Sequence, residues 1–456
     1  MFHKFIGTKG FYQRTIAIAL PIMLQQGVTN FVGLLDNIMV GQLNQAAIDG
    51  VAIANQLMFI VMFALMGGLA GPGIFLAQFK GANDQNGLRN SFRIKTLFAL
   101  VIGGLLILVY SLFGHHFVAA YLPDSPEAVQ LSMDYLSVML IGIIPLMIIQ
   151  LYATSFREIG QTRIPMKVGL LSILINLGLN YVLIFGHLGF PALGVVGAAI
   201  ATVIARSVEA FLLIFVAHYQ KHPFAEGAYS HFHIPSKLLN RVLKKGLPLF
   251  ANEVLWTVGS SMLVFAYSIR GGGTVAALTI SGTASNLFYV TFAGLAAGTA
   301  VMVGNELGAN RLQEAEENAW KLIAFGVMIA VGSGVLLALL SSFIPLIYNV
   351  DESVRMLATQ FMLVIAFFLP VFMINVGCFF VLRAGGATYS TFLFDSGFMW
   401  IVAVPLALLM STQTTISIVW IYFLVQGSDL IKTFIGIHFV RKKHWIRNLA
   451  SSSSEI

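Results

Sequence analysis

The segment AQFKGANDQNGLRN, at residues 77–90, is repeated in altered form as GNELGANRLQEAEEN at residues 304–318. The shared Gly-Ala-Asn triplet begins at Gly81 and again at Gly308, so the two copies lie 227 positions apart, the difference between 308 and 81. This separation is close to half of the 456-residue chain. Self-similarity at a fixed separation indicates that the chain consists of two homologous halves.

Apolar residues dominate both halves. Hydrophobic residues make up 58% of the chain and charged residues only 10%, whereas soluble globular domains have about 25% charged residues. This composition excludes an ordinary soluble protein and indicates a polytopic membrane protein. The net charge of +7 does not indicate nucleic-acid binding, because the Lys and Arg residues occur in short clusters between apolar runs.

Apolar runs of about 20 residues, the length that crosses a bilayer as a helix, predict the membrane spans. Twelve runs meet this criterion, at residues 15–43, 51–79, 92–114, 128–154, 164–186, 191–217, 242–268, 276–304, 319–341, 354–382, 391–412 and 416–440. We therefore expect an all-α fold of about twelve spans in two pseudo-symmetric lobes of six. The predicted division is an N-terminal lobe, a cytoplasmic linker loop, a C-terminal lobe and a disordered tail, at residues 1–217, 218–241, 242–447 and 448–456.

The basic residues predict the orientation in the membrane. Clusters of Lys and Arg follow the second, fourth and sixth predicted spans, and the segment after the last span begins with Arg441, Lys442 and Lys443. The loops after the first, third, fifth and eleventh spans contain no Lys or Arg, although Arg270 and Arg355 fall on that side. Basic residues concentrate in cytoplasmic loops, so we expect both termini in the cytoplasm. Six spans in each half give both halves the same orientation, an arrangement that alternating-access transporters use.

Asp36, in the stretch LLDNIMVG, is the only charged residue of the first predicted span. A carboxylate in a membrane helix costs on the order of 2.5 to 3.5 kcal/mol to insert and usually marks a functional site. Asn176, Asn180 and Thr202 lie at a comparable depth in the fifth and sixth spans, and a spacing of four puts the two asparagines on one helix face. We predict that these four residues form a coupling site for a proton or a sodium ion. The alternative is that they only join neighbouring helices.

Two further acids have a basic neighbour at helical spacing. Glu209 follows Arg206 by three residues, and Asp429 precedes Lys432 by three. Side chains at this spacing share one face of a helix. We therefore predict two local charge pairs with a structural role.

Two other acids of the predicted spans have no such neighbour. Glu253, five residues after Pro248, is predicted to bind a cationic substrate or a coupling ion, or else to be a buried neutral carboxyl. Asp395 lies near the inner end of its span, where it has a functional role or reaches the membrane interface. The sequence contains no acid or histidine cluster with catalytic or metal-ligand spacing. We predict neither an enzyme nor a metal site, and no cofactor besides a proton or sodium ion.

The sequence resembles the MATE family, the multidrug and toxic compound extrusion transporters. The resemblance rests on the two Gly-Ala-Asn segments, on NLGLNYVLIFG and PALGVVGAAIAT at residues 176–186 and 191–202, and on VLRAGGAT at residues 381–388. It implies a secondary-active antiporter that exports cationic or amphipathic drugs or metabolites in exchange for inward protons or sodium ions. It also implies a monomer, embedded in the lipid bilayer of the bacterial cytoplasmic membrane, that binds small organic cations.

Within this family the sequence is more similar to the DinF-like branch. That similarity implies that Asp36, Asn176, Asn180 and Thr202 form the cation site of the N-terminal lobe. DinF-like proteins can have an acid at the position of Asn180, which is absent here.

The NorM-like branch instead uses acids in the seventh and tenth helices. The tenth predicted span has no acid, and Asn375 is its nearest polar candidate. We predict Glu253, Asn375 and Asp395 as substrate-binding or secondary coupling residues. A flippase for lipid-linked precursors, from the same broader superfamily, is the alternative function. It would require a strongly cationic central cavity, whereas the basic residues here lie mostly at the cytoplasmic ends of the spans.

Overall fold

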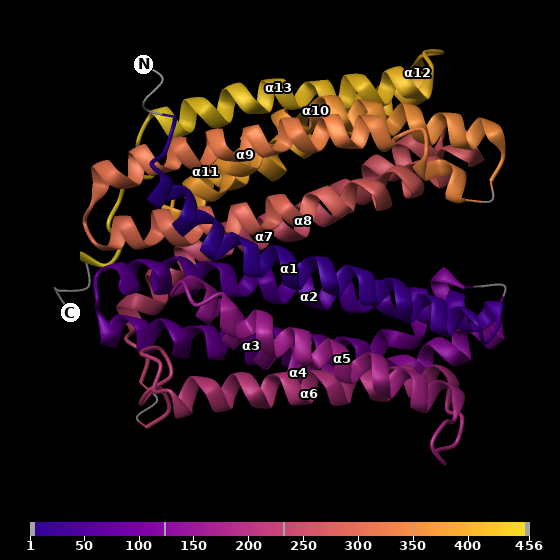
Figure 1. The fold of residues 1–456 in the computed structure, drawn as a ribbon, viewed down its shortest axis with the longest axis horizontal. Coiled ribbons are helices and arrows are strands. Elements are labelled where there is room, and N and C mark those ends of the chain that lie inside the picture. Colours follow the sequence, from indigo (N-terminus) through magenta and orange to yellow (C-terminus); the bar gives the residue numbers. More distant parts are fainter. Residues whose placement is uncertain (1–4, 123–124, 231–232, 349, 452–456) are drawn as a thin grey trace. The chain divides into compact units, whose positions relative to one another are not determined.

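The structure is a computed structural model that describes residues 5–122, 125–230, 233–348 and 350–451. Its described residues form twelve helical segments that are long and apolar enough to cross a membrane (Figure 1). The predicted fold class is therefore confirmed. In chain order the helices are α1 (Lys9–Gly41), α2 (Gln45–Gly81), α3 (Gln85–Tyr121), α4 (Pro126–Glu158), α5 (Arg163–Phe185), α6 (Gly194–Tyr219), α7 (Ser236–Ser268), α8 (Gly272–Gly308), α9 (Leu312–Leu340), the short η2 (Ile344–Ile347), α10 (Glu352–Ala384), α11 (Thr388–Phe392), the π-helical turns η3 (Leu393–Gly397) and η4 (Met399–Ala403), α12 (Val404–Gln413) and α13 (Ile418–Arg441). The segments from α11 to α12 together form the eleventh span.

The lengths of three helix pairs reproduce the sequence repeat. α1 and α7 each have 33 residues, α2 and α8 each have 37, and α4 and α10 each have 33. The repeated Gly-Ala-Asn triplet ends α2 and α8 in the same way, because Asn83 and Asn310 adopt left-handed backbone conformations with φ of 54° and 59°. Asn is one of the few residues that tolerate this conformation after a helix. The triplet therefore acts as a helix stop in both halves.

The described residues form two compact units. The C-terminal unit comprises residues 247–451 together with 5–23 and 77–83, and the N-terminal unit comprises residues 24–76 and 84–246. The boundaries of these two units differ from the predicted lobe boundaries at residues 217 and 242. In the C-terminal unit, for example, the α1 residues Ala19 and Met23 lie directly against Gly294 of α8, where a side chain would collide with them. Small residues allow such close approach of helices.

The ends of α2 and α8 cross inside the C-terminal unit. A Cβ atom at Gly81 would collide with the carbonyl oxygen of Asn305, and a Cβ atom at Gly308 would collide with that of Gln78. Gln78 and Asn305 are themselves 227 positions apart, so the two contacts are equivalent in the repeat. Gly81 and Gly308 are therefore required for the close packing of α2 and α8. Each also lies directly before the residues that end its helix.

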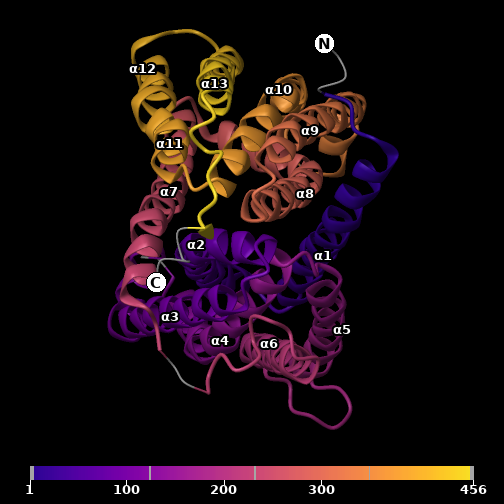
Figure 2. The same ribbon diagram turned by 90° about the vertical axis from the view of Figure 1, so that its left-hand side faces the viewer.

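Helices distant in sequence pack together within each unit. In the C-terminal unit α8, α9 and α10 lie side by side, and α13 packs on α10 (Figure 2). In the N-terminal unit α6 packs against both α4 and α5. These neighbours place the polar residues of several helices close together.

Parts of the predicted linker and of the predicted tail are ordered among the described residues. α6 ends at Tyr219 and α7 begins at Ser236, so both ends of the predicted linker, residues 218–241, are helical. Arg93 of the N-terminal unit donates from Nε to the linker carbonyl of Ala228 at 2.6 Å. In the predicted disordered tail, the backbone N–H of Leu449 donates to Gln78 Oε1 at 2.6 Å. Residues 448–451 are thus packed in the C-terminal unit, and the rest of the tail lies outside the described residues.

Candidate functional site

The N-terminal unit joins the four predicted coupling residues in one chain of hydrogen bonds. Asn180 Nδ2 donates to Asp36 Oδ1 at 2.6 Å and lies 3.4 Å from Asn176 Oδ1. Asn176 Nδ2 donates to Thr202 Oγ1 at 3.3 Å, and that hydroxyl donates to the carbonyl of Ala198 at 3.0 Å. α1, α5 and α6 therefore supply one continuous polar site.

This site has unused capacity to accept hydrogen bonds or a cation. Asn180 Oδ1 is buried and has no hydrogen-bond partner. Within the part of the chain that the structure describes, Asp36 forms no ion pair, and its side chain accepts a hydrogen bond from the neutral amide of Asn180. A carboxylate and amide oxygens in a partly buried site can hold a proton or offer ligands to a small hard cation. The coupling role of these four residues stays a prediction.

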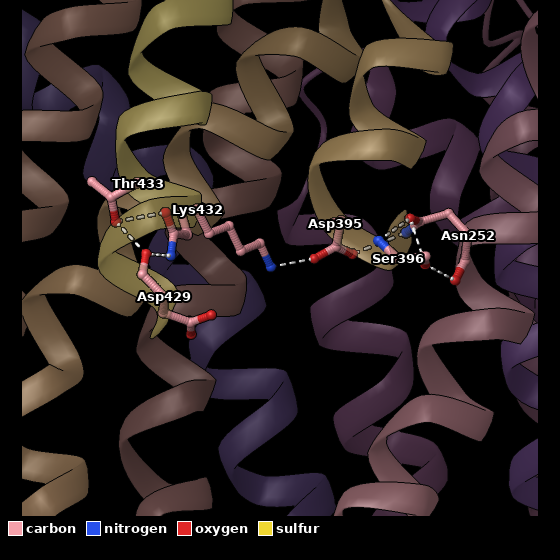
Figure 3. A network of polar contacts seen from close by, with 7 residues as sticks. Asn252, Asp395, Ser396, Asp429, Lys432 and Thr433 are labelled. Atoms are coloured by element: carbon pink, nitrogen blue, oxygen red, sulfur yellow. Dashed lines mark hydrogen bonds and ion pairs between the residues drawn. The ribbon is translucent and has the colours of Figure 1, made fainter. Parts of the chain in front are cut away.

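The C-terminal unit contains a larger network, centred on Asp395 (Figure 3). Lys432 Nζ lies 2.6 Å from Asp395 Oδ1, and Asn252 Nδ2 donates to Asp395 Oδ2 at 3.0 Å. Asn252 also accepts from the backbone N–H of Ser396 at 3.2 Å. Asp395 and Ser396 lie in the π-helical turn η3, a type of helix distortion that occurs frequently at functional sites. Asp395 therefore has an internal counter-ion, Lys432, and its functional role stays a prediction.

The other two predicted C-terminal residues have separate partners. Glu253 Oε1 lies 3.6 Å from Arg383 Nη1, so it is paired, although no basic residue neighbours it in the sequence. Asn375 is buried and donates to the backbone carbonyl of Asp429 at 3.2 Å. Among the described residues, Glu253 and Asn375 do not bond to each other. Their role in binding substrate stays a prediction.

The two predicted local charge pairs are not in direct contact, although the charges of each pair act on one another. Neither Arg206 with Glu209 nor Lys432 with Asp429 forms an ion pair among the described residues. Lys432 instead reaches Asp395 on the eleventh span. Spacing along one helix shows which side chains share a face, but a stronger partner on a neighbouring helix decides which pair forms.

Two interior charged groups were missed by the sequence reasoning. Lys95 is fully buried in the N-terminal unit, where Nζ lies 2.8 Å from Glu158 Oε2 and 2.7 Å from Thr154 Oγ1. Glu306 is buried in the C-terminal unit, accepts from Asn318 at 2.7 Å and has one oxygen, Oε2, without a partner. The sequence places Lys95 among the basic residues that follow the second predicted span, and Glu306 just beyond the eighth. Helix length was the missing signal, since α3 begins at Gln85 and contains Lys95 well inside its bounds.

The sequence repeat and the twelve spans can now be compared with known proteins. The MatE family model matches the chain twice, at residues 21–182 and 248–409. The chain belongs to the MATE family. The two matches begin 227 residues apart, the separation of the Gly-Ala-Asn triplets, so the family model follows the internal repeat. MATE proteins are transporters, not enzymes, and this MATE chain is a multi-pass membrane protein.

Curated relatives cover nearly the whole MATE chain. A probable multidrug resistance protein NorM from Oceanobacillus iheyensis is 26% identical over 441 residues, covering 94% of this chain and 96% of the relative. A protein of the same name from Bacillus cereus is 26% identical over 452 residues, covering 96% and 97%. These names do not support the expected DinF-like placement and favour the NorM-like branch. They also favour drug export over the flippase alternative.

Solved structures share the fold of this MATE chain. One is an outward-facing multidrug resistance MATE family transporter of the MOP superfamily, with a TM-score of 0.86, 19% identity and coverage of 96% of this chain and 98% of that one. Another is a MOP superfamily transporter from Pyrococcus furiosus, with the same TM-score and coverage at 20% identity. At these identities the likeness shows the fold alone.

Proposed function

We propose that this MATE protein is a secondary-active antiporter that exports cationic or amphipathic drugs or metabolites by alternating access, driven by the inward flow of protons or sodium ions. Family membership and the multidrug resistance names of its relatives support export of small molecules. The observation that carries the coupling proposal is Asp36, a carboxylate within a membrane helix that accepts a hydrogen bond from the neutral amide of Asn180.

Cation binding at this site couples the ion gradient to transport through differential affinity. Insertion of an unneutralised carboxylate in the membrane is unfavourable, and an incoming cation removes that cost. If the cation binds one conformation of the protein more tightly, it shifts the equilibrium toward that conformation. By linkage, the same shift lowers the affinity for a substrate that prefers the other conformation. Asp36 and the unpartnered Asn180 Oδ1 would hold the cation in the favoured state.

The test is efflux of ethidium from proteoliposomes under an imposed pH gradient or an imposed sodium gradient. We expect wild-type protein to respond to one of the two gradients and Asp36→Asn to reduce that response to the level of protein-free vesicles. The matched control is Asp134→Asn, since the carboxylate of Asp134 accepts an exposed hydrogen bond from Gln130 at 2.9 Å. This control should transport as the wild type does.

Each outcome has a defined meaning. If the response to the pH gradient is lost in the Asp36 variant, Asp36 is the protonation site. If efflux responds to the sodium gradient instead, the site binds sodium. Gradient-driven efflux that persists in Asp36→Asn removes Asp36 from the mechanism. Efflux that requires neither gradient contradicts the antiporter and returns the flippase as the better function.

A further inference from the structure

A row of buried polar residues continues from the Asp36 site along α5. Ser172, Asn176 and Asn180 follow one another at intervals of four residues, and all three are buried. Residues at this spacing lie on one face of a helix. Ser172 is therefore one helical turn beyond Asn176, on the side where α5 begins at Arg163. The basic residues of the sequence predict that this end of the helix faces the cytoplasm.

The residues that face each other show that α6 runs antiparallel to α5 along this row. Asn176 Nδ2 donates to Thr202 Oγ1 at 3.3 Å. One turn earlier on α5, Ser172 Oγ donates to the carbonyl oxygen of Ala205 at 2.9 Å. Each turn toward the start of α5 therefore meets residues further along α6, and both helices contribute to the row as it approaches the predicted cytoplasmic end.

Glu209 is the acid that α6 contributes to this row. A Cβ atom at Gly169, one turn before Ser172 on the same face of α5, would lie 3.4 Å from Glu209 Oε1. The side chains of Glu209 and Ser172 also contact each other through a hydrogen bond. Glu209 follows Thr202 by seven residues, about 10 Å along the helix axis and on the same face. Ser172 therefore lies between the Asp36 site and a second carboxylate.

The charge of Glu209 is compensated without direct contact. Arg157, at the end of α4, and Arg206 of α6 both act on it. Within the described part of the chain neither arginine forms an ion pair with Glu209. Arg157 Nη2 instead donates to Gln25 Oε1 at 3.0 Å. The carboxylate of Glu209 is thus open to a cation, but the two positive charges nearby disfavour a cation that stays there.

The two carboxylates of the row therefore differ in the way that binding and release of one cation require. Asp36 has no ion pair and favours a bound cation, whereas Glu209 lowers the cost of a cation in the membrane interior without retaining it. Polar and ionisable groups at successive turns of membrane helices mark ion pathways. We propose that Ser172 and Glu209 form the path by which the coupling cation leaves the Asp36 site toward the predicted cytoplasmic end of the N-terminal unit. This inference rests on the proposed function, since a release path requires a coupled cation.

Ethidium efflux from proteoliposomes, under the gradient that drives the wild type, tests the release path. We expect Glu209→Gln to lower the maximal rate about tenfold with an unchanged equilibrium affinity for ethidium, because the cation then leaves without passing a carboxylate. Glu209→Asp should retain most of the rate, and Ser172→Ala should lower it several-fold. Glu127→Gln is the matched control, because Glu127 is an exposed carboxylate of the same unit. It should transport as the wild type does.

Ethidium exchange separates cation release from folding. In this assay labelled ethidium enters vesicles that contain unlabelled ethidium, and no gradient is imposed. Exchange requires alternating access but no net release of the coupling cation. We expect Glu209→Gln and Ser172→Ala to exchange at the wild-type rate. An equal loss of exchange and of gradient-driven efflux would make the two residues structural and would overturn the release path.

Two other results distinguish the release path from the antiporter itself. Unchanged gradient-driven efflux in both Glu209→Gln and Ser172→Ala overturns the release path and leaves the proposed function standing. If Glu209→Gln does not fold, Ser172→Ala decides the matter by the same two assays. A wild-type protein that responds to neither gradient contradicts the antiporter, and the release path with it.

Discussion

The Asp36 site of the N-terminal unit and the Asp395 network of the C-terminal unit each have a carboxylate inside membrane helices, but the two differ in the source of the counter-charge. Asp36 is bonded to a neutral amide, whereas Asp395 lies 2.6 Å from the ammonium group of Lys432. A carboxylate with a resident cation is already neutralised within the protein. A carboxylate without one requires a cation from outside, which is the property that an ion-coupled transporter needs.

Repeat-equivalent positions of the two halves carry different charges. Position 169, the repeat equivalent of Asp395 at a separation of 226, is Gly169, and the equivalent of Lys432 is Arg206. Both halves therefore have a basic residue at this position, Arg206 and Lys432. Only the C-terminal half has the acid, Asp395, that pairs with it. Equivalent helices can therefore carry different electrostatic roles, because a single substitution changes which charges are paired.

The largest effect should follow the loss of the resident cation in the C-terminal unit. Lys432→Gln leaves Asp395 unpaired in a site where both side chains are 13% exposed, and loss of one partner of a buried pair costs about 3 to 5 kcal/mol. Thermal and denaturant-induced unfolding in detergent measure this loss. The double variant Lys432→Met with Asp395→Leu should recover most of it. A double variant as unstable as the single one contradicts the charge explanation.

Glu253→Gln should have an intermediate effect. The ion pair with Arg383 is longer, at 3.6 Å, and Arg383 keeps its contact with the ring of Phe380 at 5.5 Å. We expect a loss of about 1 to 3 kcal/mol, the usual cost of an unsatisfied buried group, measured by the same unfolding assay. The control is Glu352→Gln, whose 80% exposed carboxylate pairs with Arg355 at 3.8 Å. That change should cost less than about 1 kcal/mol, and equal losses in the two variants would count against the role of burial.

The smallest effect on stability should come from the residue with the largest effect on transport. Asp36→Asn removes no ion pair, and an amide can keep a hydrogen bond with Asn180. We expect a change of less than about 1 kcal/mol in the free energy of unfolding, or a gain, because a lone carboxylate is costly to bury. A loss of unfolding free energy as large as that of Lys432→Gln would show that Asp36 has a resident counter-charge. It would contradict the difference proposed between the two regions.

Much of the N-terminal site was predictable from spacing and depth. Asn176 and Asn180 share a helix face because they are four residues apart, and the lone acid of the first span had few polar partners to meet at its depth. The structure joins these residues to Thr202 by hydrogen bonds. Whether the joined residues couple ion flow to export depends on energetics that sequence periodicity does not describe.

The C-terminal network was much less predictable. Spacing along α13 predicts a pair between Lys432 and Asp429, because the two lie on one helix face. Spacing predicts no partner for Glu253, because Arg383 lies 130 positions away. An ion pair forms where geometry and desolvation favour it, and both depend on which helices become neighbours. The π-helical turn that carries Asp395 has no clear signal in the sequence.

The sequence by itself determined the membrane class, the twelve spans and the two-fold repeat, because hydrophobic length and internal similarity are properties of the linear chain. Tertiary structure alone decided which charges neutralise each other and which remain free. Lys432 pairs with Asp395 and not with Asp429, because packing brings the eleventh span next to α13. The physical reason is that electrostatic interactions at a few ångströms are strong and specific inside a membrane protein, so their outcome follows from packing and not from spacing along the chain.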